Sequence, residues 1–407
     1  MGVYRDGGFN MNYPEIKRRI EEILQPLQDE IIAFAQALVR TKSMTCEEKA
    51  VAELVEKQMQ KLGFDDVSMD SIGNVLGRIG QGEKTLLFDS HMDTVSVIDA
   101  DQWTHDPFGG EIADGKVYGR GAVDMKCPLV ASIYGAYLAG RLGLSEHTRI
   151  LVSASTMEED YDGEAVRLML KERELRPDAV VICEPTDLKI ATGHRGRALI
   201  EVNVKGKGCH ASNPNLGVNP VYLMKEVIGR VMELSDRLDY HAGEDRGSVA
   251  LSNIYCNTAS NNSVPQDATI ILDRRLANGE DETAISQEMN DALRGLAADW
   301  TFSDIPGESW TGKKFVFHSF LPAWTISEDH ELVKKAKEAY TLISEGAPTL
   351  FQMGASTNGV TTAGMLKIPT IVLGPGDIGL AHGRDEYCKI NSMLDACKIY
   401  AMLCILW

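Results

Sequence analysis

Strand-like and helix-like segments alternate along the first half of this 407-residue chain. Short apolar runs predict strands at residues 75–79, 85–90, 149–156 and 179–183. Apolar residues at helical spacing predict helices at residues 14–40 (divided at Pro26), 45–62, 125–142 and 163–171. This alternation indicates an α/β fold with a largely parallel sheet and helices on both faces. Ligands of such sheets bind beyond the carboxyl ends of the strands.

One of these strand ends carries a candidate pair of metal ligands. The run Leu86–Ser90 is followed by His91 and, two residues later, by Asp93. Residues two apart on a strand point to the same face, so both side chains can enter one cleft. A buried histidine beside a structural aspartate has the same local pattern. Imidazole and carboxylate are also ligands of a zinc-like divalent ion, and that is the hypothesis we follow.

Further carboxylates and a histidine follow at later turns and strand ends. Asp124 lies in a glycine-flexed loop before a helix, where its carboxylate can bridge two metal ions or simply cap the helix. Glu158 and Glu159 are adjacent carboxylates, which repel each other unless cations neutralise them. An acidic surface loop would have the same sequence. Glu184 and His382 each follow another predicted strand.

These residues together are sufficient for a site with two metal ions. Each ion would have two ligands of its own and would share the bridging Asp124 and a water molecule. The adjacent glutamates suit a division of roles. One would bind metal, while its neighbour would hold the attacking water as a general base.

The pattern changes near residue 193. Two predicted helices and three or four strands of antiparallel character form a compact α+β module there, and helix–strand alternation resumes after it. We therefore expect a discontinuous catalytic domain of residues 1–192 and 309–407, with an inserted domain at residues 193–308. Two domains also suit the length, because a single core usually divides beyond ~250–300 residues.

Composition excludes several classes of partner. The net charge of −18 disfavours nucleic acid and anionic membrane surfaces as partners. No apolar run approaches the ~20 residues of a membrane span, and there is no signal-peptide pattern. The eight cysteines are scattered without a CxxC pair, which predicts reduced thiols in a cytoplasmic protein. The residues before Met11 predict a disordered leader, and Met11 is an alternative start.

Six motifs in a fixed order resemble the di-zinc peptidase and deacylase family. This family includes acetylornithine deacetylase, succinyl-diaminopimelate desuccinylase, carboxypeptidase G and aminoacylase. The motifs are HMDTV, GRGAVDMK, the Glu-Glu pair, CEPT, GKGCHAS and GPG followed by AH. The resemblance implies a zinc-exopeptidase-like catalytic domain of mostly parallel sheet, interrupted by a lid and dimerisation domain.

The resemblance also implies a role for each residue of the candidate site. His91 and Glu184 would hold one zinc ion, Glu159 and His382 the other, and Asp124 would bridge them; cobalt or manganese are alternatives to zinc. Glu158 would be the general base. Asp93 would orient His91 through the second ring nitrogen.

In the inserted domain, the resemblance points to a shared site in a homodimer. His210 of the GKGCHAS motif would reach the partner's active site and donate to the oxyanion. Asn262 and Arg275 match substrate-contacting positions. Arg274 competes with Arg275 for that role, although strand alternation favours Arg275. His194, at the hinge, is suited either to packing or to ligand contact.

The chain departs from the family pattern at residues 356–358, Ser-Thr-Asn, where deacetylases of the family commonly have an aspartate. We expect this change to alter what the substrate pocket accepts. The expected activity is hydrolysis of the amide bond of a small N-acyl amino acid or dipeptide-like substrate. The alternatives are a di- or aminopeptidase and an N-carbamoyl amino acid amidohydrolase. A non-catalytic binding protein of this fold is disfavoured by the intact ligand set.

Overall fold

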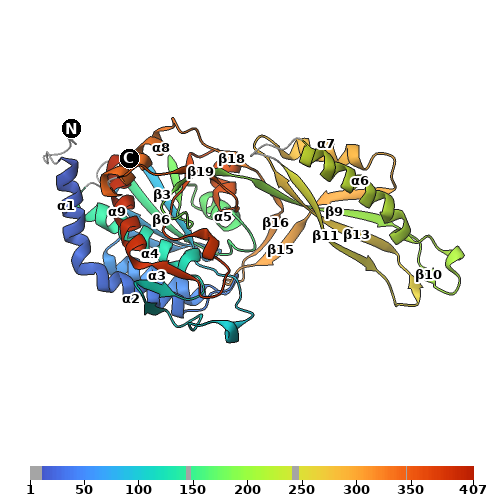
Figure 1. Ribbon diagram of the computed structural model, residues 1–407, viewed down its shortest axis with the longest axis horizontal. Coiled ribbons are helices and arrows are strands. Elements are labelled where there is room, and N and C mark those ends of the chain that lie inside the picture. The colour runs from blue at the N-terminus through green and yellow to red at the C-terminus, as the bar shows by residue number, and fades with distance from the viewer. Residues whose placement is uncertain (1–11, 144–147, 241–246, 345) are drawn as a thin grey trace.

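The computed structural model describes residues 12–143, 148–240, 247–344 and 346–407. The expected leader before Met11 lies outside the described residues. The molecule has two lobes, a broad one that contains both ends of the described chain and a narrow, elongated one (Figure 1). Among the described residues, no helix is long and apolar enough to cross a membrane.

A nine-stranded sheet forms the centre of the broad lobe. Its order is β1–β2–β6–β3–β7–β20–β8–β18, and β19 pairs with β8. The strands are β1 (Asp66–Met69), β2 (Val75–Ile79), β3 (Lys84–His91), β6 (Thr148–Ser155), β7 (Ala179–Ile182), β8 (Ile190–His194), β18 (Trp324–Thr325), β19 (Leu350–Met353) and β20 (Thr370–Val372). The central strands β6, β3, β7 and β20 are parallel, whereas β1, β2, β18 and the β8–β20 pair are antiparallel. This confirms the predicted mostly parallel sheet.

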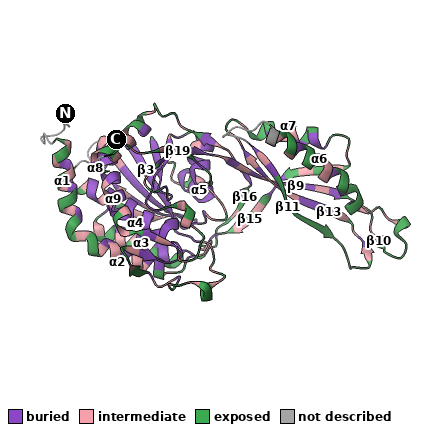
Figure 2. Ribbon diagram, in the orientation of Figure 1, coloured by how far each residue is buried: buried purple, intermediate pink, exposed green. Residues whose placement is uncertain are grey.

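Helices cover both faces of this sheet. They are α1 (Tyr13–Leu24), α2 (Gln28–Arg40), α3 (Lys49–Leu62), α4 (Cys127–Arg141), α5 (Glu164–Glu172), α8 (Glu331–Ser344) and α9 (Ile390–Leu406). Side chains of β3 alternate between the two cores. Leu86 and Phe88 pack into the core that includes α4 and α9, whereas Leu87 packs against α5. Figure 2 shows β3 as a mostly buried strand. As predicted, Pro26 divides two helices, in the 3₁₀ turn η1 (Gln25–Leu27).

The narrow lobe is an antiparallel sheet covered by two helices. Its strands are β9 (Gly196–Lys205), β11 (Ser248–Asn257), β13 (Asp267–Leu276), β14 (Ala298–Phe302) and β17 (Phe320–Leu321), in the order β11–β13–β9–β14 with β17 beside β9. The helices are α6 (Pro220–Tyr240) and α7 (Glu282–Ala292). Every second residue of β9 is buried, and these residues share a core with both helices. At the far tip, β10 (Cys209–His210) pairs with β12 (Ser263–Val264).

The chain passes between the lobes at two points. It leaves the large sheet between β8 and β9, and it returns between β17 and β18. β17 lies beyond residue 308 and still pairs with β9. A separate hairpin of β15 (Asp304–Glu308) and β16 (Lys314–His318) lies at the junction of the lobes (Figure 1).

A small sheet and two turns surround the strand ends of the broad lobe. β4 (Glu111–Ala113), β5 (Lys116–Tyr118) and β21 (Tyr387–Lys389) form a small sheet. The turns η3 (Ala122–Lys126) and η5 (Val360–Met365) precede α4 and β20. Together with the large sheet, these elements position the candidate site.

Candidate metal centre

The predicted ligands converge where the parallel strands of the large sheet end. His91 is the last residue of β3, Glu158 and Glu159 follow β6, and Glu184 follows β7. The remaining two residues come from irregular segments, Asp124 from η3 and His382 from the turn after β20. The structure therefore brings together all six of these residues, which are separated by up to 291 positions in the sequence.

The carboxylate of Asp124 lies between the two histidines. Its Oδ1 is 3.0 Å from His91 Nε2, and its Oδ2 is 3.3 Å from His382 Nε2. On the first side, His91 Nε2 is also 3.4 Å from Glu184 Oε1. On the other side, His382 Nε2 is 3.0 Å from Glu159 Oε2. Each oxygen of Asp124 thus faces its own histidine and glutamate.

The donor set fits two divalent cations. His91 belongs to two groups of three ligand atoms, one with Asp124 and Glu159 and one with Glu158 and Glu184, and within each group the atoms lie within 4.8 Å of one another. Burial raises the pKa of Glu184 to about 7 and raises the pKa of Glu158 and Glu159 as well. Buried carboxylates this close together need a compensating positive charge, which bound cations supply. Nitrogen and oxygen donors of this kind suit zinc and its neighbours in the transition series.

Asp93 positions the two glutamates as well as His91. Its carboxylate accepts the backbone N–H groups of Glu158 at 3.0 Å and of Glu159 at 3.1 Å, and the hydroxyl of Thr45 at 3.0 Å. The Nδ1 of His91 donates to the backbone carbonyl of Asp93 at 3.0 Å and is 3.4 Å from its carboxylate. The predicted orienting contact is therefore made mainly by the main chain. The hydrogen bonds to the Glu-Glu turn could not be foreseen from the sequence.

A second carboxylate outside the ligand set, Glu386, holds the backbone of the bridging residue. Its Oε1 accepts the N–H groups of Val123 at 2.9 Å and of Asp124 at 3.1 Å. Arg120 donates to the other oxygen at 2.6 Å and to the carbonyl of His382 at 3.1 Å. Sequence reasoning missed this pair, and the only signal was that both residues lie within four positions of a proposed ligand.

Glu48, also missed, supports the turn that precedes Glu158. One oxygen of its buried carboxylate accepts the N–H groups of Met157 at 2.9 Å and Cys46 at 3.0 Å. Met157 has a φ of +59°, which is unfavourable for a residue with a side chain. The hydrogen bond from Met157 helps to hold this backbone conformation, which directs Glu158 into the site.

Two of the residues predicted in the inserted domain lie far from this cluster. His210 pairs with Ser263 in the β10–β12 ladder, and the carbonyl of the adjacent Asn262 accepts the N–H of Ala211 at 2.8 Å. His210 and Asn262 are therefore close to each other at the far tip of the narrow lobe (Figure 1). Within a single chain, neither residue belongs to the metal cluster.

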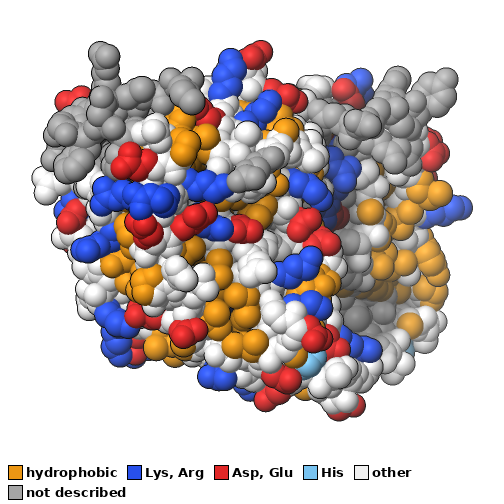
Figure 3. Space-filling view, turned by 60° about the vertical axis from the view of Figure 1, so that its left-hand side comes forward, with side chains coloured by type: hydrophobic (Ala, Val, Ile, Leu, Met, Phe, Trp, Pro, Cys, Tyr) orange, Lys and Arg blue, Asp and Glu red, His pale blue; other side chains and the backbone are white. Residues whose placement is uncertain are grey.

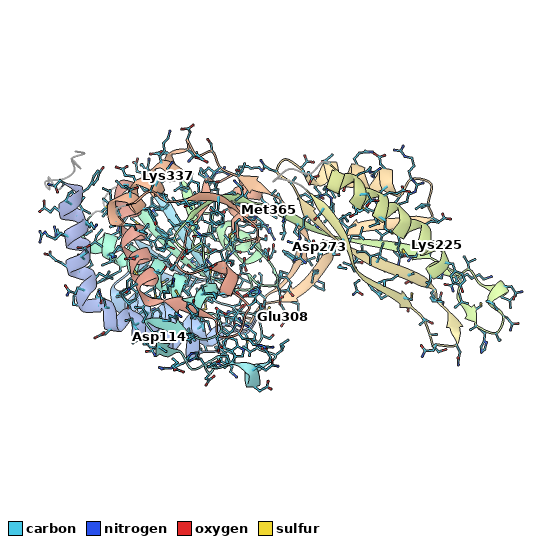
Figure 4. The ribbon with its side chains drawn as sticks, viewed as in Figure 1. Asp114, Lys225, Asp273, Glu308, Lys337 and Met365 are labelled. Atoms are coloured by element: carbon cyan, nitrogen blue, oxygen red, sulfur yellow. The ribbon has the colours of Figure 1, made fainter. Side chains whose placement is uncertain are left out.

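The two candidate arginines of β13 have different surroundings. Arg274 is fully buried and forms ion pairs with Glu280 at 2.6 Å and Glu288 at 2.9 Å, so its role is structural. Arg275 lies on the other face, 39% exposed, and pairs with Asp273 at 2.8 Å. Asp273 lies at the junction of the lobes (Figure 4). The alternation that favoured Arg275 is present in the structure.

A cavity of about 170 Å³ extends from Glu159 to the narrow lobe. Arg197 of β9, directly opposite Arg275 in register, lines it and pairs with Asp273 at 3.1 Å. Burial raises the pKa of Asp162, which also lines the cavity, and the charges of Arg197 and Arg275 oppose that rise. Arg197 was missed, although its position on an alternating strand that follows the hinge was a usable signal. Figure 3 shows the recess between the lobes.

The hinge histidine and the divergent Asn358 both belong to the interior. His194 donates from Nδ1 to the carbonyl of Arg195 and accepts the indole N–H of Trp324 at 2.8 Å. Asn358 is 2% exposed and donates to the buried carboxylate of Asp89 at 2.8 Å. The side chain of Asn358 is therefore bound inside the core, and the expectation that the change at residues 356–358 alters what the substrate pocket accepts stays a prediction.

A largely buried cluster of histidines and carboxylates, with the exposed His382 at its edge, lies at the strand ends of a mostly parallel α/β sheet and is the site of a metal-dependent hydrolase. The chain belongs to peptidase family M20/M25/M40, whose family model matches residues 87–405. This confirms the resemblance found in the motifs.

Similar proteins agree with this assignment. The uncharacterized protein YgeY of Escherichia coli strain K12 is 32% identical over 390 residues, which cover 95% of this chain and 97% of that protein. The M20 family metallo-carboxypeptidase Sso-CP2 from Sulfolobus solfataricus has a TM-score of 0.72 at 18% identity, covering 93% of this chain and 99% of that one. The Bacillus subtilis YXEP protein, described as a dinuclear metal binding peptidase, has a TM-score of 0.66 at 15% identity, covering 94% and 98%. At these identities the two structures show a shared fold.

Proposed function

We propose that this enzyme uses two divalent metal ions to hydrolyse the amide bond of a small N-acyl amino acid or dipeptide-like substrate. The observation that carries the proposal is the position of the Asp124 carboxylate, with one oxygen toward His91 and the other toward His382. This is the arrangement that a carboxylate bridging two ions requires.

The ligands divide into two sets around this bridge. His91 and Glu184 would hold one ion, and Glu159 and His382 the other. Bound ions of this type polarise a carbonyl group and make water more acidic. Zinc is the ion we propose, and cobalt or manganese suits the same donors.

Glu158 would transfer the proton in this reaction. Its side chain is buried, Oε2 lies 3.9 Å from His91 Nε2, and its backbone is fixed by Asp93. Burial and the surrounding carboxylates raise its pKa, as befits a group that must accept a proton near neutral pH. Glu158 would take a proton from the attacking water and return it to the leaving amine.

We also propose that the active enzyme is a homodimer in which His210 completes the partner's site. His210 is exposed at the far tip of the narrow lobe, together with Asn262. An imidazole from the partner could donate to the oxyanion of the tetrahedral intermediate, a contact worth ~3–4 kcal/mol. Arg275 would then contact the substrate from the junction of the lobes.

A cytoplasmic location is part of the same proposal. All eight cysteines are free, and five of them are buried in the broad lobe. Thiols that remain unpaired are typical of a reducing compartment.

Substitution of Glu158 tests the mechanism. We expect Glu158→Ala to lose nearly all hydrolysis of a panel of N-acyl amino acids while it keeps both metal ions, because Glu158 is the base and not a ligand. Metal content would be measured by mass spectrometry, and Glu331→Ala, an exposed carboxylate paired with Lys335, is the matched control. Near-normal activity of Glu158→Ala would refute the mechanism. Parallel assays of free dipeptides and N-carbamoyl amino acids separate the proposed deacylase from the two alternatives.

A further inference from the structure

The β15–β16 hairpin belongs to the narrow lobe in sequence but is attached to the broad lobe at its tip. The hydroxyl of Thr311 donates to the carbonyl of Ser71 at 2.8 Å. Trp310 packs against the core of the broad lobe and over Gly73, where a Cβ would lie 2.2 Å from the indole nitrogen. Gly73 has a φ of +104°, so a larger residue is disfavoured there on two grounds. The tip of the hairpin is thus fixed beside the catalytic core.

Two aromatic residues of β16 connect the hairpin to the catalytic turn. The rings of Phe315 and Phe317 lie edge-on to Tyr161, with centroids 5.0 Å and 5.5 Å away. Tyr161 donates its N–H to the carbonyl of Met157 and is three residues beyond Glu158. The hairpin therefore packs directly on the segment that carries the proposed base.

One side of this hairpin forms a wall of the 170 Å³ cavity that begins at Glu159. Ile305 and Phe317 come from the hairpin, and Leu199 and Leu321 complete the apolar part of the lining. Phe317 is 6% exposed, so its ring is held in place. Phe315, two residues earlier on the same strand, contacts Tyr161 but does not line the cavity.

Charged groups of both signs lie in and beside the cavity. Arg197 pairs with Asp273, which also binds Arg275, and both arginines lie near the buried Asp162. Glu159 and Asp160 also line the cavity, so carboxylates outnumber guanidinium groups around it. An anionic substrate group would be repelled there, whereas an uncharged group would not.

The volume defines the size of that group. An apolar cavity of about 150 Å³ is known to accept benzene, so a cavity of 170 Å³ accepts a branched aliphatic group or a single aromatic ring. A fused double ring exceeds it.

We propose that this cavity is the subsite for an uncharged, apolar group of the substrate, and that Phe317 and Ile305 of the hairpin set the largest size it accepts. The proposal deepens the proposed function and rests on it, since the subsite lies beside the ligand Glu159. The substrate class is then an N-acyl amino acid or dipeptide with a branched aliphatic or single-ring side group.

A graded series of substrates tests this inference on the metal-loaded enzyme. One series varies the acyl group of N-acylglycines from acetyl through isovaleryl and phenylacetyl to naphthylacetyl. The other varies the amino acid of N-acetyl derivatives from alanine through leucine and phenylalanine to naphthylalanine. We expect kcat/KM to rise up to the single ring and to fall by about tenfold for the double ring in one of the two series. That series identifies the side of the amide that occupies the cavity.

Two variants assign the effect to the hairpin. Phe317→Ala should accept the double ring, with a relative gain of about tenfold, whereas Ile305→Phe should shift the preference toward the smallest group. Phe315→Ala is the matched control, because it also removes an aromatic contact with Tyr161 but leaves the cavity wall intact. Equal changes in the Phe315 and Phe317 variants, or no change in either series, would overturn the proposal.

Binding measurements separate this inference from the proposed function. Acetate, isovalerate, phenylacetate and naphthylacetate would be titrated into the metal-loaded enzyme by calorimetry. We expect affinity to rise by about fourfold for each buried methylene up to the single ring, and to do so in Phe315→Ala as well. If affinity rises along the series but the enzyme hydrolyses no amide, the amidase proposal is rejected and the subsite is retained. If affinity is the same for all four acids, the subsite is rejected, whatever the enzyme hydrolyses.

Discussion

At the scale of single residues, a group outside the ligand set holds the backbone of the proposed bridging ligand. Glu386 accepts the backbone N–H groups of Val123 and Asp124 and is paired with Arg120. In Glu386→Gln, the amide N–H₂ would face either the Arg120 guanidinium or the backbone N–H groups of the bridging loop, donor against donor, so the support of this loop would be weakened. We expect metal affinity to fall about 10–100-fold. Competition with a chromophoric chelator would measure this loss.

The control for that variant is Glu331→Gln, which changes an exposed carboxylate 53% open to solvent. We expect its metal affinity to match that of the unmodified enzyme. Equal affinities in the Glu386 and Glu331 variants would show that the backbone of Asp124 holds its position without Glu386.

The buried hydrogen bonds of Asn358 lead to a prediction about stability. Its amide donates to Asp89 at 2.8 Å and to Ser155 at 3.1 Å, and its carbonyl accepts the N–H of Gly163 at 2.7 Å. Asn358→Asp would place two carboxylates together in the core and leave Asp89 without its donor. We expect a loss of about 2–3 kcal/mol in the free energy of unfolding, measured by urea denaturation.

In the double variant Asp89→Asn with Asn358→Asp, the amide of residue 89 would donate to the carboxylate of residue 358, so the hydrogen bond would be restored in the opposite direction. We expect this double variant to regain part of the lost stability, since the two residues interact directly. If Asn358→Asp alone is as stable as the unmodified chain, the hydrogen bond to Asp89 contributes little.

The positions of the proposed ligands were predictable from the sequence. The residues that hold the backbone of these ligands by hydrogen bonds were not. His91, Glu158 and Glu184 each follow an apolar run, so strand prediction alone places them at one edge of a parallel sheet. The contact between Glu386 and Asp124 joins residues 262 positions apart, and no local pattern encodes it. The orientation of Asp93 toward the Glu-Glu turn likewise depends on how β3 and β6 lie side by side.

At the scale of elements, the hinge between the lobes contains a neutral histidine. Burial lowers the pKa of His194 to about 4. The hydrogen bonds agree, because Nδ1 donates to the carbonyl of Arg195 and Nε2 accepts from Trp324. A proton on Nε2 would oppose the indole N–H of Trp324. The hydrogen bonds at the β8–β18 junction therefore require the uncharged imidazole of His194.

This hinge should lose stability in acid. The unfolded chain binds a proton at His194 below pH ~6.5, whereas the folded chain does so only near pH 4. The free energy of unfolding therefore falls as the pH decreases through this window, by up to about 3 kcal/mol from this residue. In His194→Gln that penalty is absent, so the stability difference between the two proteins should shrink by about 2–3 kcal/mol between pH 7 and pH 4.5. Urea denaturation at both pH values would measure it, and a constant difference would contradict a neutral His194.

Element boundaries were predictable where a local signal was strong. Pro26 divides α1 from α2, and Gly63, with a φ of +77°, ends α3. The start of α3 was placed four residues too early, because the Glu48 carboxylate binds the N–H of Cys46 and holds a turn there. The β15–β16 hairpin was not predicted. Its contacts are with Ser71 and Tyr161, which are distant in sequence.

At the scale of the whole molecule, the narrow lobe exposes a surface that suits a second copy of the chain. β11 is the end strand of its sheet, and its outer edge has no partner strand among the described residues. Ile254 and Tyr255 on this strand are 46% and 48% exposed, and Tyr222 on α6 is 77% exposed. Exposed strand edges with apolar side chains are typical of surfaces that pair with another chain. In the proposed homodimer, His210 of one chain would act in the site of the other.

Mixing two inactive variants tests whether the active site is shared. Glu158→Ala and His210→Ala should each be inactive as homodimers. If His210 acts in the partner's site, a mixed dimer contains one site with both residues intact. Random exchange of subunits at equal concentrations should then restore about a quarter of the normal activity, because half of the dimers are mixed and half of their sites are complete. Activity after mixing, unfolding and refolding together would be compared with each variant treated alone. No recovery in a mixture that sediments as a dimer would place His210 outside the partner's site.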